Sequence, residues 1–238
     1  MLGGNSYGQL GDGTNDDAMV PVTVSDIDTA LAVSAGAHHT CALLPDETVQ
    51  CWGDNHRGEL GADTGFDLFS LTPVAVDSLA GVTAITTQGA TNCARLTDGT
   101  VRCWGQNWYG ELGQGSNQGP EGCILGSPYI LSYPCSRTPV TVPGISDAVA
   151  ISGTCALLAG GDALCWGPND VGQLGHGVTT GPELCKLTLM TNIPTQQGFD
   201  QYCSPTPVEV VAASAAASSG AATTSRWHRS RTVGWRAV

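Results

Sequence analysis

The sequence has few basic residues, few aromatic residues and no long hydrophobic run. Lysine and arginine number 9 in 238 residues, against 21 aspartate and glutamate, and the formal net charge is −12. An acidic surface repels phosphate backbones and anionic headgroups at long range, so we expect neither nucleic acid nor a membrane surface as a partner. No stretch of about 18 consecutive apolar residues occurs, so no membrane-spanning helix is predicted. The single lysine, Lys186, provides no ammonium cluster for phosphates or for a Schiff base.

Recognisable catalytic and cofactor motifs are also missing. There is no P-loop and no dinucleotide-binding G-x-G-x-x-G motif between a strand and a helix. The adjacent His38 and His39 would face opposite sides of a strand, and His56 and His176 lie at different repeat positions with no carboxylate and nucleophile to form a triad. Residues 12–17 are rich in oxygen donors but lack the glycine and distal glutamate of a calcium-binding loop, so we expect a solvated turn. We therefore predict a protein that is not an enzyme and that has no cofactor and no metal.

Glycine is abundant, with 32 residues, and it marks an internal repeat. A ten-residue phrase W-G-x-N-x-x-G-x-L-G begins at Trp52, Trp104 and Trp166, and a copy with leucine in place of tryptophan begins at Leu2. The copies start 50, 52 and 62 residues apart. A Pro-Val phrase follows every copy, and a Cys-Ala phrase precedes the three tryptophan copies. Phrases that recur in one order at this period predict a repeat architecture.

Each repeat has the pattern of short strands joined by turns. If Cys93 and Cys103 oppose each other in a hairpin, residues 97–99 form a three-residue loop with Gly99 where positive φ is needed. The flanking segments alternate in polarity and are rich in β-branched residues, as half-buried strands are. Up to about residue 210, no segment has a capped, 3.6-residue apolar stripe. The predicted fold class is all-β.

The ten cysteines resolve into five local pairs. Opposed hairpin cysteines have Cα atoms about 4.5–5.5 Å apart, within disulfide range. The other four cysteines lie in two insertions at equivalent points of successive repeats. An even count in paired positions favours an oxidising compartment, and the lack of a C-x-x-C pair disfavours metal binding; ten reduced, buried thiols in a cytosolic protein are the alternative. The predicted pairs are Cys41–Cys51, Cys93–Cys103, Cys155–Cys165, Cys123–Cys135 and Cys185–Cys203.

The W-G-x-N-x-x-G-x-L-G phrase resembles the repeat of the regulator of chromosome condensation family, which includes alpha-tubulin suppressor-like proteins. The preceding cysteine hairpin resembles that of its secreted bacterial members. The resemblance covers about residues 1–216, in units that begin near residues 2, 52, 104 and 166, the last running into a broken fifth unit. It implies a β-propeller of four-stranded blades of about 50 residues, about seven to a ring, and the repeated hairpins agree with this fold.

About four such units make an incomplete arc, which would expose blade faces and strand edges. We therefore expect either a part of a longer protein or a propeller that closes by self-association. The chain begins inside a repeat, and we expect its export signal to lie in a missing upstream part. Residues 217–238, a low-complexity segment followed by a basic one, are expected to be disordered or out of frame; a basic nucleic-acid-binding arm is the alternative.

The residues that recur in every repeat have structural roles in this interpretation. The tryptophans fill the space between neighbouring blades, the motif glycines permit positive φ and close backbone approach, and the motif asparagines bond to local turns. The expected blade core comprises Trp52, Trp104, Trp166, Leu10, Leu60, Leu112 and Leu174.

Function should reside in the loops that differ between repeats. The variable segments are residues 15–17, residues 63–67, the pair Trp108-Tyr109 and the two cysteine-closed insertions. Trp108 and Tyr109 occupy positions that vary between repeats, so they could contact a partner. Local packing against an insertion is the alternative.

We interpret the chain as a non-enzymatic scaffold of an extracellular or cell-surface protein that binds a protein or glycan partner through its variable loops. Its acidic surface favours a basic or polar partner. The family resemblance suggests two alternatives. One is guanine nucleotide exchange on a small GTPase, and the other is inhibition of a secreted enzyme by the propeller face.

Titration of free thiols in the denatured, unreduced protein tests the predicted compartment. Five disulfides should leave close to zero reactive thiols per chain, and reduction should then release about ten. A count near ten before reduction would contradict the disulfides and support the cytosolic alternative.

Overall fold

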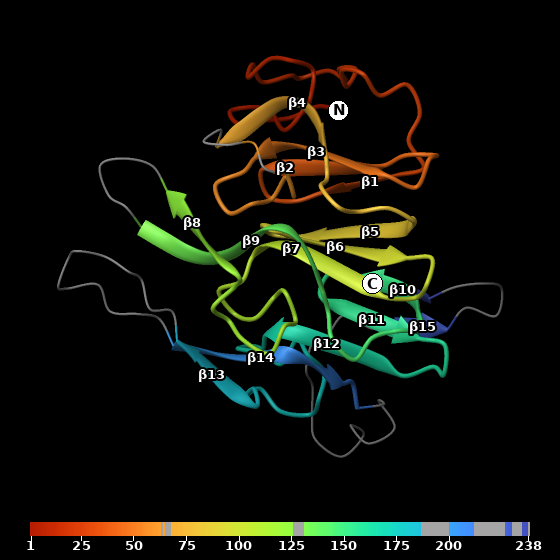
Figure 1. Ribbon diagram of the computed structural model, residues 1–238, viewed down its shortest axis with the longest axis vertical. Helices are drawn as coiled ribbons and strands as arrows, with labels where there is room; N and C mark the ends of the chain where they lie inside the picture. Colours follow the sequence, from red (N-terminus) through yellow and green to blue (C-terminus); the bar gives the residue numbers. More distant parts are fainter. Residues whose placement is uncertain are drawn as a thin grey trace.

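A computed structural model describes residues 1–62, 64, 68–125, 131–186, 200–211, 227–229 and 235–237. Every element in these residues is a β-strand, and the strands form three larger antiparallel sheets and one two-stranded sheet. Figure 1 shows the three larger sheets following one another in chain order, as successive blades of an open, unclosed β-propeller. The expected all-β fold and incomplete arc are confirmed.

The first blade is a four-stranded meander in which each strand pairs with the next along the chain. The hairpin between its second and third strands is tight, and a hydrogen bond from Leu44 N to Thr48 O closes its loop. Its strands are β1 (Ala32–Ala35), β2 (His39–Leu43), β3 (Val49–Asp54) and β4 (Phe69–Ala75).

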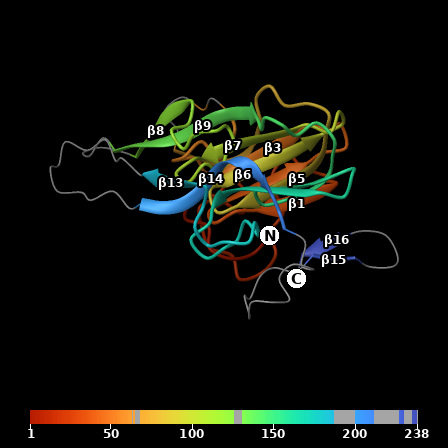
Figure 2. The ribbon, with the colours of Figure 1, turned by 90° about the horizontal axis from the view of Figure 1, so that it is seen from below.

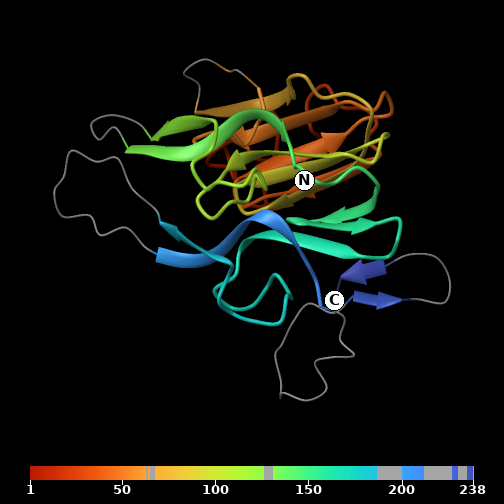
Figure 3. The same ribbon diagram turned by 60° about the horizontal axis from the view of Figure 1, so that its bottom comes forward.

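The second and third blades repeat this meander and add one strand each, so that each has five strands. The added strand comes from the insertion and pairs with the outermost strand of its blade. The second blade contains β5 (Val82–Gln88), β6 (Thr91–Leu96), β7 (Val101–Gln106), β8 (Glu121–Leu125) and β9 (Leu131–Thr141). The third contains β10 (Ala148–Ser152), β11 (Cys155–Leu158), β12 (Ala163–Pro168), β13 (Glu183–Lys186) and β14 (Asp200–Glu209). Figures 2 and 3 show both insertion pairs, β8–β9 and β13–β14, extending to the same side of the arc.

The structure contains all five predicted disulfides and no free cysteine. The three hairpin disulfides join directly opposed residues of the second and third strands of a blade, with Cα atoms 4.1 Å apart. This distance is shorter than expected and is closest to that of a non-hydrogen-bonded pair, where antiparallel strands approach most closely. The two insertion disulfides span 5.8 Å between Cα atoms.

A bulge in the outermost strand of each blade lies opposite the motif tryptophan of the third strand. The register with the outermost strand shifts between Cys51 and Gly53, and it shifts at the equivalent positions of the other two blades. The glycine after each tryptophan has a positive φ of 93° to 101°, which side chains rarely adopt. Between the two flanking pairs the outermost strand has three residues where the third strand has only the tryptophan, so the extra residues of the bulge lie on the outermost strand.

The hydrophobic core lies between the blades, because each buried cluster combines side chains from two successive sheets. The first cluster joins Leu43, Val49 and Leu60 to Val82, Ala94 and Trp104. The second cluster joins Val101, Leu112 and Val142 to Ala148, Ala156 and Trp166.

The chain before the first blade and the chain after the third form little sheet in the described residues. Near the N-terminus, a single bridge pairs Gly3 with Ala18. In the tail, β15 (Trp227–Arg229) pairs with β16 (Trp235–Ala237). Most of residues 217–238, and residues 63 and 65–67 of the predicted variable loop, lie outside the described residues, so the disorder expected from residue 217 stays a prediction.

A matched pair of glycine substitutions tests the packing between blades. Gly110 and Gly144 have nearly the same φ, 79° and 80°, but a Cβ on Gly110 would lie 2.4 Å from Pro205 Cα of the next blade, whereas nothing lies within 4 Å at Gly144. Gly144→Ala should lower the free energy of unfolding by about 1–2 kcal/mol through its backbone conformation alone. Gly110→Ala should cost about 1–3 kcal/mol more through the clash. Equal losses of unfolding free energy in urea titrations would contradict this packing.

Candidate binding face

One tryptophan is buried at each interface between successive units, and we call this interface a joint. Each indole N–H donates a hydrogen bond to a backbone carbonyl of the preceding unit, and each ring is at most 1% exposed. The bonds run from Trp52 to Gln9, from Trp104 to Glu59 and from Trp166 to Glu111, at 2.9, 3.0 and 2.8 Å. Each ring therefore fixes how one unit sits on the next.

The motif asparagines and leucines shape the loop that supplies these carbonyls. In every unit, the backbone N–H of the leucine donates to the side-chain oxygen of the asparagine five residues earlier, and the leucine is buried. The pairs are Leu10–Asn5, Leu60–Asn55, Leu112–Asn107 and Leu174–Asn169, at 2.8 to 3.1 Å. All seven residues expected in the blade core are thus buried in or beside the joints.

The residue before each motif leucine is a glutamate or a glutamine, and its side chain turns back on its own loop. Its side-chain oxygen accepts the backbone N–H two residues earlier, at 2.7 to 3.0 Å. The four residues are Gln9, Glu59, Glu111 and Gln173. Sequence reasoning missed this position, although the constant Glu or Gln in every copy is a signal that could have found it.

Two of these four side chains are buried carboxyls. Glu59 is 1% exposed, and burial together with the nearby Asp54 raises its pKa to about 8. The Arg57 guanidinium lies 3.7 Å from the Glu59 carboxyl and 3.9 Å from that of Asp54 and partly offsets this rise. Glu111 is 7% exposed, and burial raises its pKa although Tyr109 N and Gln106 Nε2 donate to it.

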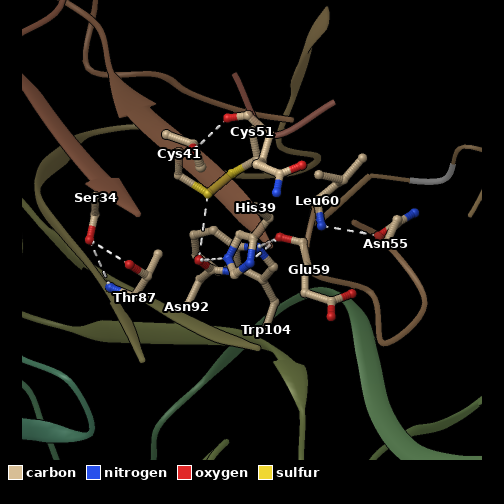
Figure 4. Close-up of a disulfide and its surroundings, with 12 residues drawn as sticks. Ser34, His39, Cys41, Cys51, Asn55, Glu59, Leu60, Thr87, Asn92 and Trp104 are labelled. Carbon is tan, nitrogen blue, oxygen red and sulfur yellow. Dashed lines mark hydrogen bonds between the residues drawn. A yellow bond between two sulfur atoms is a disulfide. The ribbon is translucent and has the colours of Figure 1, made fainter. Parts of the chain in front are cut away.

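Behind Glu59, a buried polar network links the first two blades (Figure 4). His39 Nε2 lies 2.8 Å from Asn92 Oδ1, and Asn92 Nδ2 donates to the Glu59 carbonyl at 2.9 Å. Cys41 Sγ lies 3.5 Å from the same Asn92 oxygen. Burial lowers the pKa of His39, which favours a neutral ring. The adjacent His38 is exposed, so the two histidines do face different surroundings.

Charged and aromatic side chains follow one another across the joints, and we call them the aromatic row. The row consists of Tyr7, His38, His56, Arg57, Trp108 and Tyr133. The Tyr7 ring lies 5.2 Å from His38 and 5.9 Å from His56, measured between centroids. The Arg57 guanidinium lies 5.3 Å from the Trp108 ring, whose centroid is 5.1 Å from that of Tyr133. His56 Nδ1 bonds to the Asp54 carboxylate.

A cavity of about 460 Å³ opens beside this row, where turns from all three blades converge. Arg57 and His38 border it from the first blade. The second and third blades contribute Gln88, Gln106, Tyr109, Glu111, Thr154, Gln173 and Gln201. The wall therefore combines apolar surface with polar side chains, and it includes one buried carboxyl.

The structure gives Trp108 and Tyr109 different surroundings. Trp108 is half-buried against Tyr133 of β9, which is the local packing against an insertion considered above. Tyr109 lines the cavity. Asp12, from the oxygen-rich segment, accepts hydrogen bonds from Thr14 in a tight turn. In the described part of the chain, no three His, Cys, Asp or Glu residues gather as a metal site, and no helix is long and apolar enough to cross a membrane.

Comparison with known proteins matches the repeats directly. Two family models, both described as the Regulator of chromosome condensation (RCC1) repeat, match residues 1–43 and 31–59. The human E3 ubiquitin-protein ligase HERC2 is 30% identical over 189 residues, which cover 74% of this chain and 4% of HERC2. The Arabidopsis thaliana ultraviolet-B receptor UVR8 is 31% identical over 178 residues, 73% of this chain and 38% of UVR8. The chain belongs to the RCC1 repeat family.

The solved structures agree on the fold of these RCC1 repeats. In a crystal structure of Kap60 bound to yeast RCC1 (Prp20), the matching chain superposes with a TM-score of 0.66 at 16% identity. The match covers 90% of the present chain and 44% of that chain. The RCC1 repeats described here therefore span less than half the length of each of these three relatives.

Glu59→Gln tests the buried carboxyl of this RCC1 repeat through the pH dependence of stability. The pKa of Glu59 is about 8 when folded and 4.5 in its ordinary state, so its contribution to stability is full below pH 4.5 and is lost as the pH rises to 8. Glutamine makes the same loop bond at Gln9 and Gln173. The free energy of unfolding of the variant, taken relative to that of the wild type, should therefore increase by about 2–4 kcal/mol between pH 5 and pH 8.

Urea midpoints at the two pH values measure this difference. Glu47→Gln, on an exposed turn, serves as the matched substitution and should follow the wild type. If the stability of Glu59→Gln changed with pH in the same way as that of the wild type, the raised pKa of Glu59 would be contradicted.

Proposed function

We propose that this chain is part of a non-enzymatic RCC1-repeat scaffold that works in an oxidising, extracellular compartment and binds a protein partner. Five disulfides support the compartment, because such bonds persist mainly outside the reducing cytosol. The yeast RCC1 propeller, which shares the fold, was solved bound to Kap60, so this fold can present a surface to a protein. The glycan partner, the exchange-factor activity and the enzyme-inhibitor role stay alternative predictions.

The aromatic row and the adjoining cavity carry the proposal. Their residues come from the turns and motif loops of successive units, and the buried indole joints hold these loops rigidly together. Aromatic and arginine side chains on such a platform are the residue types that anchor protein interfaces. Tyr7, Arg57 and Tyr109 are only partly buried and are available for contact.

The opposite ends of the strands have a different character. There, the hairpin turns satisfy their own polar groups, since Asp46 and Asp98 each accept bonds from the threonine two residues later. Two blades thus present the same local turn at that end, whereas the aromatic row differs from unit to unit. The variable end is the better candidate for specific recognition.

Affinity capture with matched variants tests the proposed face. The oxidised chain is immobilised and exposed to a secreted-protein mixture, and retained proteins are identified and then titrated individually. Tyr7→Ala combined with Tyr109→Ala should weaken a genuine partner at least about tenfold. Asp162→Ala, on an exposed turn of the opposite end, should not. Equal retention by both variants, or retention of nothing by the wild type, would overturn the proposal.

A further inference from the structure

The cavity at the aromatic row has an imbalance of charge in its wall. Glu111 is its buried carboxyl, and the two hydrogen bonds it receives come from neutral donors, the backbone of Tyr109 at 2.7 Å and the side chain of Gln106 at 3.0 Å. No described lysine, arginine or histidine side chain forms an ion pair with it. By contrast, Glu59 at the same position of the preceding unit has Arg57 beside it.

The other charged groups near the cavity do not compensate Glu111. Arg57 borders the cavity, but its guanidinium lies between Asp54 and Glu59 and over the Trp108 ring. Asp170 adds a second acidic group on this side, because both it and Glu111 raise the pKa of Tyr109 beyond the effect of burial. His38 is exposed at the border. Among the described residues that line the cavity, Glu111 is thus the acidic group, and Arg57 and His38 lie at its border.

The remaining wall suits a positively charged group with several N–H donors. Gln88, Gln106, Gln173 and Gln201 line the cavity from the second and third blades, and the side-chain oxygens of Gln88 and Gln173 also accept the backbone N–H groups of Thr154 and Val171. The volume of about 460 Å³ falls in the range of ordinary ligand sites. A cation that entered would replace its lost hydration by a charge-assisted hydrogen bond to Glu111 and by amide oxygens. An anion would meet the Glu111 carboxyl, and the Arg57 guanidinium at the border already lies 3.9 Å from the Asp54 carboxyl and 3.7 Å from the Glu59 carboxyl.

We propose that this cavity binds one cationic side chain, a lysine ammonium or an arginine guanidinium, with Glu111 as its counter-ion. That the side chain belongs to a protein partner rests on the proposed function; the cation site itself does not. The net charge of −12 acts in the same direction, because it draws basic partners to the whole surface.

Binding of the cation is linked to pH. Burial keeps Glu111 protonated above the ordinary range of a glutamate, so a cation must displace that proton to form the ion pair. The affinity should therefore rise as the pH increases from 5 to 8. Glu111→Gln should therefore flatten this pH dependence. His38, Arg57 and Tyr109 are the other ionisable groups that line the cavity. Asp170 lies close enough to raise the pKa of Tyr109.

Two small probes of matched shape provide the test. Nα-acetyl-L-arginine methylamide carries the cation, and the citrulline analogue replaces it with a neutral urea. In NMR titrations of the full, oxidised chain at pH 8, the arginine probe should shift cavity resonances with a millimolar Kd, and the citrulline probe should bind at least about tenfold more weakly. Equal binding of the two probes, or no binding of the arginine probe, would overturn the inference.

Three variants test whether the arginine probe binds beside Glu111. Glu111→Gln keeps the loop bond that glutamine makes at Gln9 and Gln173, and it should lower the affinity for the arginine probe at least about tenfold. Gln173→Glu replaces the amide that donates to Asp170 at 2.8 Å by a second carboxyl on the cavity wall, and the added negative charge should raise the affinity several-fold at pH 8. Asp162→Asn removes the same unit of charge from the opposite end and should leave the affinity within about twofold.

Unchanged binding in both Glu111→Gln and Gln173→Glu would place the cation elsewhere and reject the proposal. The small probes also keep this result separate from the capture experiment. A chain that captures a partner through the row but ignores the arginine probe would contradict only the cation site, and a chain that binds the probe without any partner would contradict only the proposed function.

Discussion

The hydrogen bond from each motif tryptophan to a carbonyl of the preceding unit is the interaction on which the rest of the structure depends. The three bonds have nearly the same length, and each joins a fully buried ring to a loop held by an asparagine. No blade buries its hydrophobic face alone, because both core clusters draw on two sheets. The three indoles are the largest fully buried side chains of the described residues, and their hydrogen bonds set the orientation of each joint.

The same joint explains the composition of the candidate binding face. The residue whose carbonyl accepts the indole also folds its side chain back onto the loop, so a glutamate there becomes a buried carboxyl beside the joint. Glutamine at this position satisfies the geometry without charge, as in the first and last units. The choice between the two residues thus changes the electrostatics of the face without changing the fold.

The disulfides stabilise individual blades and not the joints between blades. Each hairpin disulfide joins two neighbouring strands of one blade, and each insertion disulfide joins the two strands that protrude from a blade. None connects one blade with another. Covalent bonds therefore stiffen the blades internally, while packing and hydrogen bonds alone decide how the blades lie against each other, as with His39 and Asn92.

The sequence by itself determined the all-β fold, the blade period and the five cysteine pairs, because these features depend on residues that are close in the chain or repeated along it. The disulfides in Cys-Trp hairpins follow from a ten-residue spacing and the geometry of a single turn. Only the tertiary structure brought Glu111, Arg57 and Gln173 to one cavity, since each comes from a different unit. The reason is physical: charge, burial and pKa depend on neighbours supplied by the next blade, and no local pattern specifies how two units meet.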